Sequence, residues 1–456
     1  MEEALVLGDT PICNFSTIGC DVHSDNVVCC SLQRQKDGSW VQTSQTFATD
    51  YRSLNDFSEW CKKFNPTCIL MESTGSYWMS SFDVLNEARL PITIVNPAHV
   101  KGIAGRKTDH ADSHWLATMA LNNSYKPSYV PPREYRHLRA VERNVTKQLG
   151  IVQSCKNRET KLFVTGGYRL NVFSDEFGKT AMLAKNAIIE GKTPEEVLAV
   201  VKQSIGGKKL KATNDELLAA FYGCMTPQLK YAIESNRRMY DFANQEVKAG
   251  KKYVISEVRR LDEDSFQLLQ TIPGIDEWSS AVIIVEIGGV SNFLNAFNNG
   301  DSFSAWLGLC PGNNNSNSKR TGKKGRHGDP YLRNALCESA QAAVRTKGTT
   351  FQSKFRSLTV RLGYKRSIVA IAHKIAKMVY YVTSRQVAFR DPHIDYQSLT
   401  CQRNKARWIK QLLRCNDLEI TVRNKKTGEL IDSQSFQESQ RVERAVALQD
   451  AVARQA

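Results

Sequence analysis

Apolar and polar residues alternate near the start of the chain in a pattern that predicts a sheet. Residues 17–33 contain two apolar runs on either side of a polar turn, and the first run alternates with a period of two. Strands that alternate with helices are typical of an α/β domain, which we expect over residues 14–126. The other elements predicted there are strands at 68–71 and 92–95 and helices at 77–88 and about 109–121.

The middle of the chain has a helical periodicity instead. Apolar residues recur at steps of three and four from residue 138 onward, and at heptad spacing across residues 233–261. A coiled coil and a helix packed against another domain are both open, because the second heptad stripe is weak. That stripe consists of Asn236, Ala243 and Gly250. We assign residues 127–265 to a helical or coiled-coil insert with a basic loop at 206–209.

The last part of the chain is expected to form a mainly α-helical domain over residues 266–395, followed by a polar C-terminal extension over 396–456. Apolar residues at 420–422 and 430–431 flank a Lys-Lys-Thr-Gly turn and predict a hairpin. The segment Ile-Pro-Gly-Ile at 272–275 resembles a helix-hairpin-helix turn, whose backbone amides can hold a phosphate. A simple turn between two helices explains the same residues equally well.

The charge balance favours a polyanionic partner. The chain carries 62 Lys and Arg against 46 Asp and Glu, a formal net charge of +16, and a basic surface attracts nucleic acid through steering and counterion release. We expect no membrane partner and a cytoplasmic location in a prokaryotic host, because neither a membrane span nor a signal peptide is recognisable. The 12 cysteines include no CxxC pair, so reduced thiols are expected rather than a zinc site.

Four carboxylates stand where a nuclease of the ribonuclease-H type needs them. Asp21 lies on the first predicted strand, Glu72 follows another, and Asp109 and Asp112 share one face at a helix start. Phosphodiester cleavage places negative charge on the attacking and leaving oxygens, and a pair of magnesium ions held by carboxylates stabilises that charge. Without a cation, the four groups would repel one another. The sequence therefore predicts a Mg²⁺ site, with two ions.

Each carboxylate also has an ordinary structural explanation. Asp21 could be a turn residue, with Asp25 as a rival for its role, and Asp109 could be a helix N-cap with Asp112 as the capping acid. The order and context of the four residues together favour the metal cluster.

A glycine-rich loop in the last third of the chain carries serines and many basic residues. It runs from Gly308 through Ser316 and Ser318 to Gly328, before a helix predicted to open at Pro330. Such a loop can follow a nucleic-acid backbone closely. Composition alone describes it equally well as a basic flexible loop with ordinary serines. The candidate nucleic-acid-binding residues are Lys319, Arg320, Lys323, Lys324, Arg326 and Arg333.

Two sets of motifs, in this order and spacing, carry a resemblance to a known family. The first set comprises Asp21, Glu72 in Glu-Ser-Thr-Gly-Ser-Tyr, Asn96-Pro97 and Lys-Thr-Asp-His-Ala-Asp at 107–112. The second comprises Ile-Pro-Gly-Ile at 272–275, Gly-Leu-Cys-Pro at 308–311, Ser316, Gly328 and Leu332-Arg333. Over about residues 15–385, the chain resembles the DEDD transposases of the insertion-sequence-110 family.

The resemblance implies a fold and a set of site residues. It implies a RuvC-like (ribonuclease-H-like) N-terminal domain and a mainly helical C-terminal transposase domain. The metal-binding tetrad would be Asp21, Glu72, Asp109 and Asp112. The nucleophile would be Ser316, five residues after the proline of the Gly-Leu-x-Pro motif. Asn317 replaces the family's usual glycine, so Ser318 stays a rival, and Ser113 replaces a usual alanine.

The resemblance also implies an activity. The chain would be a transposase that cuts and rejoins DNA through a phosphoserine intermediate. A bridge RNA encoded by the element would pair with donor and target DNA, and the protein would act as a homo-oligomer, dimer or tetramer. The main alternative is a RuvC-like metal nuclease or junction resolvase in which Ser316 is idle. A non-catalytic nucleic-acid binder is the third class, which the clustered acids disfavour.

Overall fold

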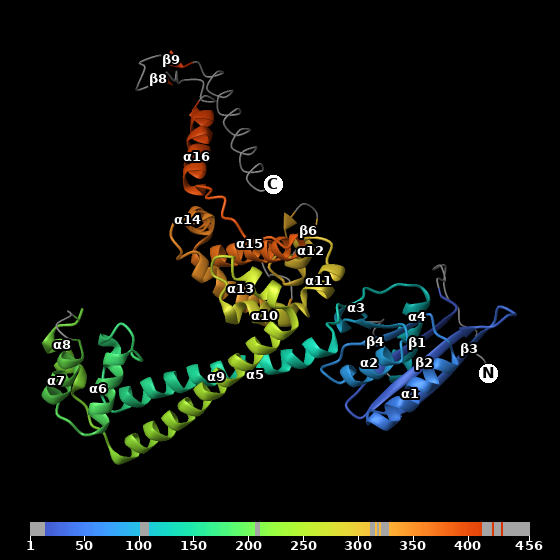
Figure 1. Cartoon of the computed structure of the whole chain (residues 1–456), viewed down its shortest axis with the longest axis horizontal. Coiled ribbons are helices and arrows are strands. Elements are labelled where there is room, and N and C mark those ends of the chain that lie inside the picture. The colour runs from blue at the N-terminus through green and yellow to red at the C-terminus, as the bar shows by residue number, and fades with distance from the viewer. Residues whose placement is uncertain are drawn as a thin grey trace. The chain divides into compact units, whose positions relative to one another are not determined.

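The chain separates into two compact units, unit 1 (Met1–Arg133) and unit 2 (Glu134–Ala456), which are considered individually. An α/β sheet forms unit 1, and helices dominate unit 2 (Figure 1). The computed structural model describes residues 14–100, 109–205, 210–310, 315–316, 319–320, 328–412, 422–423 and 430–431.

Unit 1 is built on a five-stranded sheet in the order β3-β2-β1-β4-β5. Strands β1, β2 and β3 are antiparallel neighbours, whereas β1, β4 and β5 run parallel. The four strands expected from sequence are confirmed, and β3 is an addition. The bounds are β1 (Ser16–Val22), β2 (Asn26–Arg34), β3 (Trp40–Ala48), β4 (Cys68–Glu72) and β5 (Ile92–Val95).

Helices cover both faces of this sheet. One face packs against α1 and α2 in a core that contains Ile18, Cys20, Phe57 and Trp78. The other face packs against α4, which contacts β1, β2 and β4. The predicted helices at 77–88 and 109–121 are confirmed as α2 and α4. The bounds are α1 (Tyr51–Lys63), α2 (Trp78–Glu87), α3 (Pro97–Val100) and α4 (Asp109–Leu121).

A mixed sheet with helices on both faces, followed by a helical region, fits the ribonuclease-H-like α/β class expected for the first part of the chain. The parallel strands β1 and β4 carry their carboxyl ends to the same edge of the sheet. That edge is where side chains from several elements can converge.

Unit 2 contains two long helices, α5 (Arg133–Thr165) and α9 (Pro227–Leu269). They pack against each other in antiparallel orientation. Buried side chains of both helices, Val145 and Val247 among them, form a shared core. A Cβ added to Gly250 would lie 2.4 Å from a methyl of Val145. The residues of the weak heptad stripe therefore lie where α9 packs closely against α5. The heptad pattern reflects the pairing of these two helices within one chain.

A small helical bundle follows α5 and precedes α9. Its core includes Phe163 of α5 and Ile233 of α9, so both long helices take part in it. Lys185 is fully buried there, with Nζ 3.3 Å from a carboxylate oxygen of Glu159. The bounds are η1 (Leu170–Val172), α6 (Lys179–Ile189), α7 (Pro194–Ile205) and α8 (Asn214–Phe221). The predicted basic loop at 206–209 lies outside the described residues.

The remaining described elements of unit 2 are mainly helical. They are α10 (Glu277–Ile287), α11 (Val290–Ala296), α12 (Gly300–Trp306), β6 (Asn315–Ser316), β7 (Lys319–Arg320), α13 (Pro330–Ala343), α14 (Thr350–Leu362), α15 (Tyr364–Arg385), α16 (Tyr396–Leu412), β8 (Val422–Arg423) and β9 (Leu430–Ile431). The pairing of β8 with β9 confirms the predicted hairpin. No single described helix is long and apolar enough to cross a membrane; α10 and α11 pass that test only as a pair bent by 51°.

The Ile-Pro-Gly-Ile segment forms the turn between α9 and α10. Gly274 has a φ of +91°, and a Cβ added there would lie 2.2 Å from the carbonyl oxygen of Ser339 on α13. The N-terminus of α10 is capped by Asp276, whose side chain accepts a hydrogen bond from Ser279 N. The glycine is thus explained by close packing on α13, and the capping carboxylate disfavours a phosphate at this helix end. These contacts favour the simple helix–helix turn.

Candidate active site

Asp21 and Glu72 are brought together by the register of two parallel strands. Cys20 of β1 is paired with Met71 of β4, so Asp21 and Glu72 follow on neighbouring strands. Side chains alternate between the faces of a strand, and both carboxylates lie on the face that packs against α4. Asp21 is 9% exposed, although it carries a carboxylate.

Asp109 and Asp112 come from the first turn of α4. This helix lies directly on β1, because Gly19 has no side chain: a Cβ there would lie 2.0 Å from the carbonyl oxygen of Ser113. The hydroxyl of Thr17 also donates a hydrogen bond of 3.0 Å to the carbonyl of Ala117. Close packing of α4 on β1 therefore carries the two helix carboxylates to the edge where β1 ends.

His23 is a member of this cluster that the sequence interpretation missed. Its Nε2 lies 3.2 Å from Oδ2 of Asp21 and 3.6 Å from Oδ1 of Asp109. One ligand atom from each of His23, Asp21 and Asp109 fits within 4.8 Å, a grouping that could hold a metal ion. The signal was present, since residues two apart on a strand share a face. His23 was overlooked because it falls within the segment interpreted as a polar turn.

The electrostatics of the cluster call for a cation. Burial raises the pKa of Asp21, and the charges of Asp112, Glu72 and Asp109 raise it further, whereas His23 lowers it. The other three predicted carboxylates thus all act on Asp21. Carboxylate oxygens with an imidazole nitrogen can ligate a divalent metal ion, so the residues present fit such an ion.

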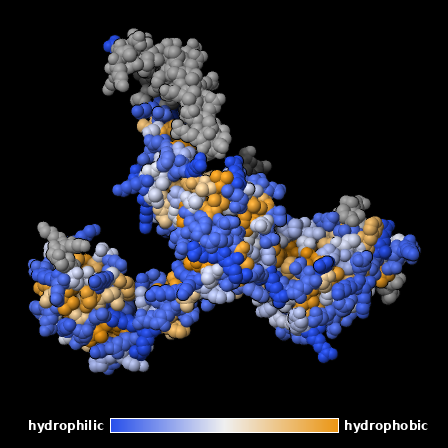
Figure 2. Space-filling model, viewed as in Figure 1, coloured by the Kyte–Doolittle hydropathy of each residue, from blue (hydrophilic) through white to orange (hydrophobic). Residues whose placement is uncertain are grey.

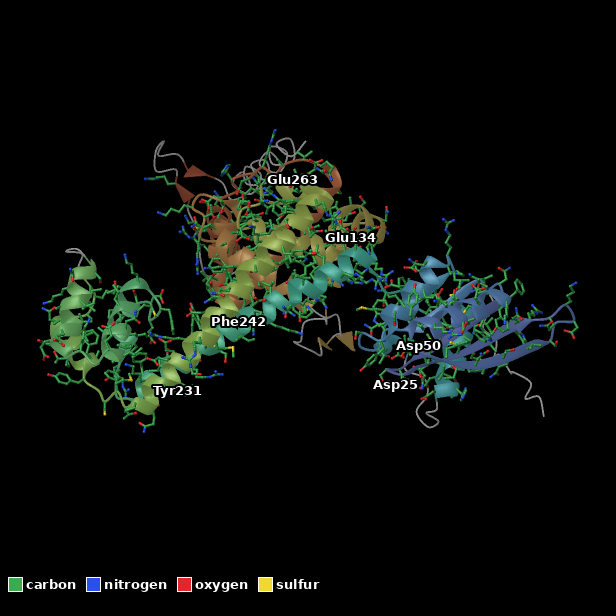
Figure 3. All side chains as sticks on the ribbon, turned by 60° about the horizontal axis from the view of Figure 1, so that its bottom comes forward. Asp25, Asp50, Glu134, Tyr231, Phe242 and Glu263 are labelled. Carbon is green, nitrogen blue, oxygen red and sulfur yellow. The ribbon has the colours of Figure 1, made fainter. Side chains whose placement is uncertain are left out.

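The structure bears on the ordinary explanations for Asp21 and Asp109, which are a turn residue and a helix N-cap. Asp21 lies within β1, whereas Asp25 lies in the turn before β2 and is exposed (Figure 3). Helix α4 begins at Asp109, so Asp109 and Asp112 both lie in its first turn. A helix start tolerates two acids, because the helix dipole favours negative charge there. The N-cap explanation for Asp109 does not account for its contact with His23.

The serine loop is described only in part. The backbone of Ser316 pairs with that of Lys319 in the short antiparallel ladder of β6 and β7, next to Arg320. The rival Ser318 and the predicted binding residues Lys323, Lys324 and Arg326 lie outside the described residues. Of the predicted nucleic-acid-binding side chains, Arg333 is described, as a half-buried residue of α13.

The two ends of the serine loop are held together by backbone packing. A Cβ added to Gly328 would lie 2.3 Å from the carbonyl carbon of Leu307, so only glycine permits this approach. Asp329 then caps α13 by accepting hydrogen bonds from the backbone N–H groups of Tyr331 and Leu332. The loop that carries Ser316 therefore starts and ends at one place in unit 2.

A second group of buried charges lies beside the cap of α13. Glu286 of α10 is fully buried, and the Nε and Nη2 atoms of Arg143 donate to its two carboxylate oxygens at 2.9 and 3.0 Å. Arg139 Nε lies 2.7 Å from the same carboxylate. Arg143 also lies 3.6 Å from Asp329 Oδ2 and 4.4 Å from the ring centre of Tyr331. This cluster connects α5 to α10 and to the end of the serine loop.

Two separate parts of the chain match models of known protein families. Residues 18–164 match a family model described as a transposase of the DEDD IS110 type. Residues 266–356 match a second model, described as the transposase IS116/IS110/IS902 family. Together the two matches cover about half of the chain.

Curated relatives agree with these matches. The chain is 23% identical over 331 residues to a transposase for insertion sequence element IS1111A from Coxiella burnetii, covering 71% of this chain and 79% of that one. It is also 23% identical over 338 residues to a probable family 20 transposase from Pseudomonas aeruginosa, covering 72% and 87%. A solved RuvC structure from Thermus thermophilus aligns at 14% identity with a TM-score of 0.21, covering 25% of this chain and 100% of that one.

Proposed function

This chain belongs to the IS110 family of insertion-sequence transposases, and we propose that it cuts and rejoins DNA through a metal-dependent acidic site and a serine nucleophile. The observation that carries the proposal is the convergence of Glu72, Asp109 and Asp112 on the buried carboxylate of Asp21, whose pKa their charges raise. Such a group is costly to fold unless a cation neutralises it.

The proposed cofactor is Mg²⁺, with two ions. Asp21, Glu72, Asp109 and Asp112 would hold it, and His23 would add a nitrogen ligand or orient Asp21 and Asp109. Bound magnesium stabilises negative charge on the phosphate oxygens during cleavage. The carboxylates would hold the metal at the edge of the sheet where β1 and β4 end, so that the scissile phosphate would bind there.

Ser316 is the proposed nucleophile, with Ser318 as the rival. Its Oγ forms a bond to phosphorus while the bond from phosphorus to the 3′ oxygen breaks. The serine proton leaves, and the 3′ oxygen gains a proton, so a phosphoserine ester and a free 3′ hydroxyl result. The covalent ester keeps the phosphodiester's energy, which allows strand rejoining without an external energy source.

The proposed partners are donor DNA, target DNA and a bridge RNA encoded by the element, with the protein acting as a dimer or tetramer. The nucleic-acid contacts are assigned to Lys319, Arg320, Lys323, Lys324, Arg326 and Arg333, through phosphate groups. We also propose the division into a nuclease domain at 14–126, an insert at 127–265, a transposase domain at 266–395 and an extension at 396–456.

Trapping of a covalent intermediate tests this function. Native protein is incubated with Mg²⁺, its element-end DNA and the flanking RNA, and then separated on a denaturing gel. We expect a protein–DNA adduct that is lost in Ser316→Ala and in Asp21→Asn. Ser318→Ala is the matched control, which keeps the adduct if Ser316 is the nucleophile.

The outcomes separate the candidate functions. Cleaved DNA without an adduct, unaffected by Ser316→Ala, would replace the proposal with a metal nuclease or junction resolvase. An adduct lost in Ser318→Ala but kept in Ser316→Ala would move the nucleophile by two residues.

A further inference from the structure

A basic groove lies between α14 and α16, and none of the residues used in the proposed chemistry lines it. Its volume is about 700 Å³. Residues from both helices line it, and none of them is acidic. In Figure 2 hydrophilic residues predominate on the visible surface around α14. The basic residues in its lining are Lys354, Arg356, Arg361, Arg403, Lys405 and Arg407.

Polar contacts fix the two walls of the groove relative to each other. The hydroxyls of Ser357 and Thr400 lie 2.7 Å apart, one from each helix. Ser353 Oγ donates to Asp395 Oδ1 at 3.2 Å, just before α16 begins. The ammonium of Lys354 lies 4.0 Å from the ring centre of Tyr396. These contacts hold the two walls together and position Lys354 at the groove.

These cations are not neutralised within the described part of the chain. None of the six forms an ion pair with a described carboxylate, whereas many other arginines of the protein do. Burial lowers the pKa of Lys354, and the charges of Lys374, Arg403 and Arg361 lower it further. Like charges crowded in this way oppose folding and are relieved by a polyanion.

We propose that this groove binds the phosphodiester backbone of a nucleic acid. Four of its six cations are arginines, whose planar guanidinium matches phosphate oxygens with paired hydrogen bonds. The large apolar side chains that line it are Leu358 and Val360, too few to bury an apolar peptide or insert into a lipid surface. DNA and RNA share this backbone chemistry, and the test distinguishes them.

The inference goes beyond the proposed function and does not depend on the serine or the metal. Binding is therefore measured with EDTA present, so that strand cleavage does not take place. The full chain is titrated with labelled duplex DNA of mixed sequence and, separately, with an RNA stem-loop, over a range of salt concentrations.

The diagnostic variant is Arg361→Gln with Arg403→Gln, one cation from each wall. We expect affinity for the nucleic acid that occupies the groove to fall roughly tenfold to fiftyfold near 0.1 M salt. The slope of log affinity against log salt should fall by about 1.8 for duplex DNA, since each lost phosphate contact removes about 0.9. The variant should unfold at an equal or higher temperature than the native protein, because cation repulsion is reduced.

Two further variants separate local binding from general charge. Arg361→Lys with Arg403→Lys keeps the charges and should keep most of the affinity. Arg345→Gln with Lys347→Gln removes two exposed cations between α13 and α14, outside the groove, and should change neither affinity nor slope. An equal loss in this control would overturn the proposal, because it would show that net charge alone sets binding.

A native thiol reports on occupancy of the groove directly. Cys401 lines the groove and is exposed, so its alkylation can be followed by mass spectrometry. Bound nucleic acid should slow alkylation of Cys401 in the native protein, and the Arg361→Gln, Arg403→Gln variant should lose that protection. Protection by duplex DNA alone or by RNA alone identifies the occupant. Equal alkylation with and without either saturating nucleic acid contradicts the inference.

Discussion

Each unit contains a buried carboxylate with charged neighbours, Asp21 in unit 1 and Glu286 in unit 2, and the two surroundings are built in opposite ways. In unit 1, Asp21 is surrounded by Glu72, Asp109 and Asp112, and His23 is the basic group that contacts it among the described residues. In unit 2, the fully buried Glu286 is held by Arg139 and Arg143. Among the described residues, no Arg or Lys pairs with Asp21, whereas two arginines pair with Glu286.

The difference separates a site from a structural support. Buried carboxylates paired with arginines are satisfied in the folded chain, and removing a partner leaves an uncompensated charge. The acids around Asp21 raise the pKa of its carboxyl, and a bound cation would relieve that repulsion. Burial also raises the pKa of Glu286, to about 8, although Arg143 and Arg139 act in the opposite direction. Substitutions in the two clusters should therefore have opposite effects on stability and activity.

The largest effect is expected for Asp21→Asn, in an assay of DNA strand cleavage. Metal-assisted stabilisation of a phosphoryl transition state is worth several kcal/mol, so activity should fall at least about a thousandfold. Asp25→Asn is the matched control, because it removes an equal charge from the exposed turn four residues later. If activity survives Asp21→Asn, or falls equally with Asp25→Asn, the cluster around Asp21 is not a catalytic site and does not differ in function from the cluster around Glu286.

In unit 2 the expected loss is stability. Replacing Arg139 and Arg143 by methionine leaves Glu286 buried without its partners and should lower the free energy of unfolding by about 3–5 kcal/mol. Chemical denaturation measures this change. Arg260→Gln, which removes exposed ion pairs with Glu134 and Glu257, is the control and should change stability little, because solvent screens exposed pairs. A small loss in the double variant would mean that Glu286 is neutral.

Gly19→Ala tests how the acidic cluster is assembled. The added methyl would press on the backbone of α4 and should cost roughly 1–3 kcal/mol of stability, as overpacking does. It should also weaken metal binding, since α4 carries two of the carboxylates. Gly150→Ala, in open space on α5, should be neutral or stabilising by up to about 1 kcal/mol. Full metal affinity in Gly19→Ala would show that α4 is dispensable for the site.

The smallest effect is expected for His23→Ala. If His23 orients the carboxylates, metal affinity should fall about tenfold to a hundredfold, while the affinity for nucleic acid in EDTA stays unchanged. Calorimetric titration with Mn²⁺ measures the affinity for metal, and fluorescence anisotropy measures the affinity for nucleic acid. An unchanged metal affinity would show that His23 neither binds the metal nor orients the carboxylates.

Strong periodicity made much of unit 1 predictable. The strands at 17–33, 68–71 and 92–95 and the helices at 77–88 and 109–121 were expected, because each has one buried face or lies wholly in the core. Strand β3 was missed because it is an edge strand whose side chains are mostly exposed. Helix α1 was missed although its pattern was present. Asp50, labelled in Figure 3, is its N-cap, and Leu54, Phe57 and Trp60 are buried.

The sites were less accessible to sequence reasoning. The order of the acidic motifs suggested one cluster, and the structure places Asp21 near the other three acids through strand register and the contact at Gly19. The bond between Arg143 and Glu286 joins residues far apart in the chain, which one sequence without homologues does not reveal. The same holds for the groove between α14 and α16. The role of Ser316 stays a prediction.

The central claim is that the Asp21 cluster needs a divalent cation, and thermal unfolding of the native protein and Asp21→Asn tests it most directly. In EDTA, Asp21→Asn should unfold at a higher temperature, because the pKa of Asp21 is raised and its ionised form destabilises the fold near neutral pH. Mg²⁺ should raise the unfolding temperature of the native protein and leave that of Asp21→Asn nearly unchanged. An equal Mg²⁺ response in both proteins, or none in the native protein, would contradict the account.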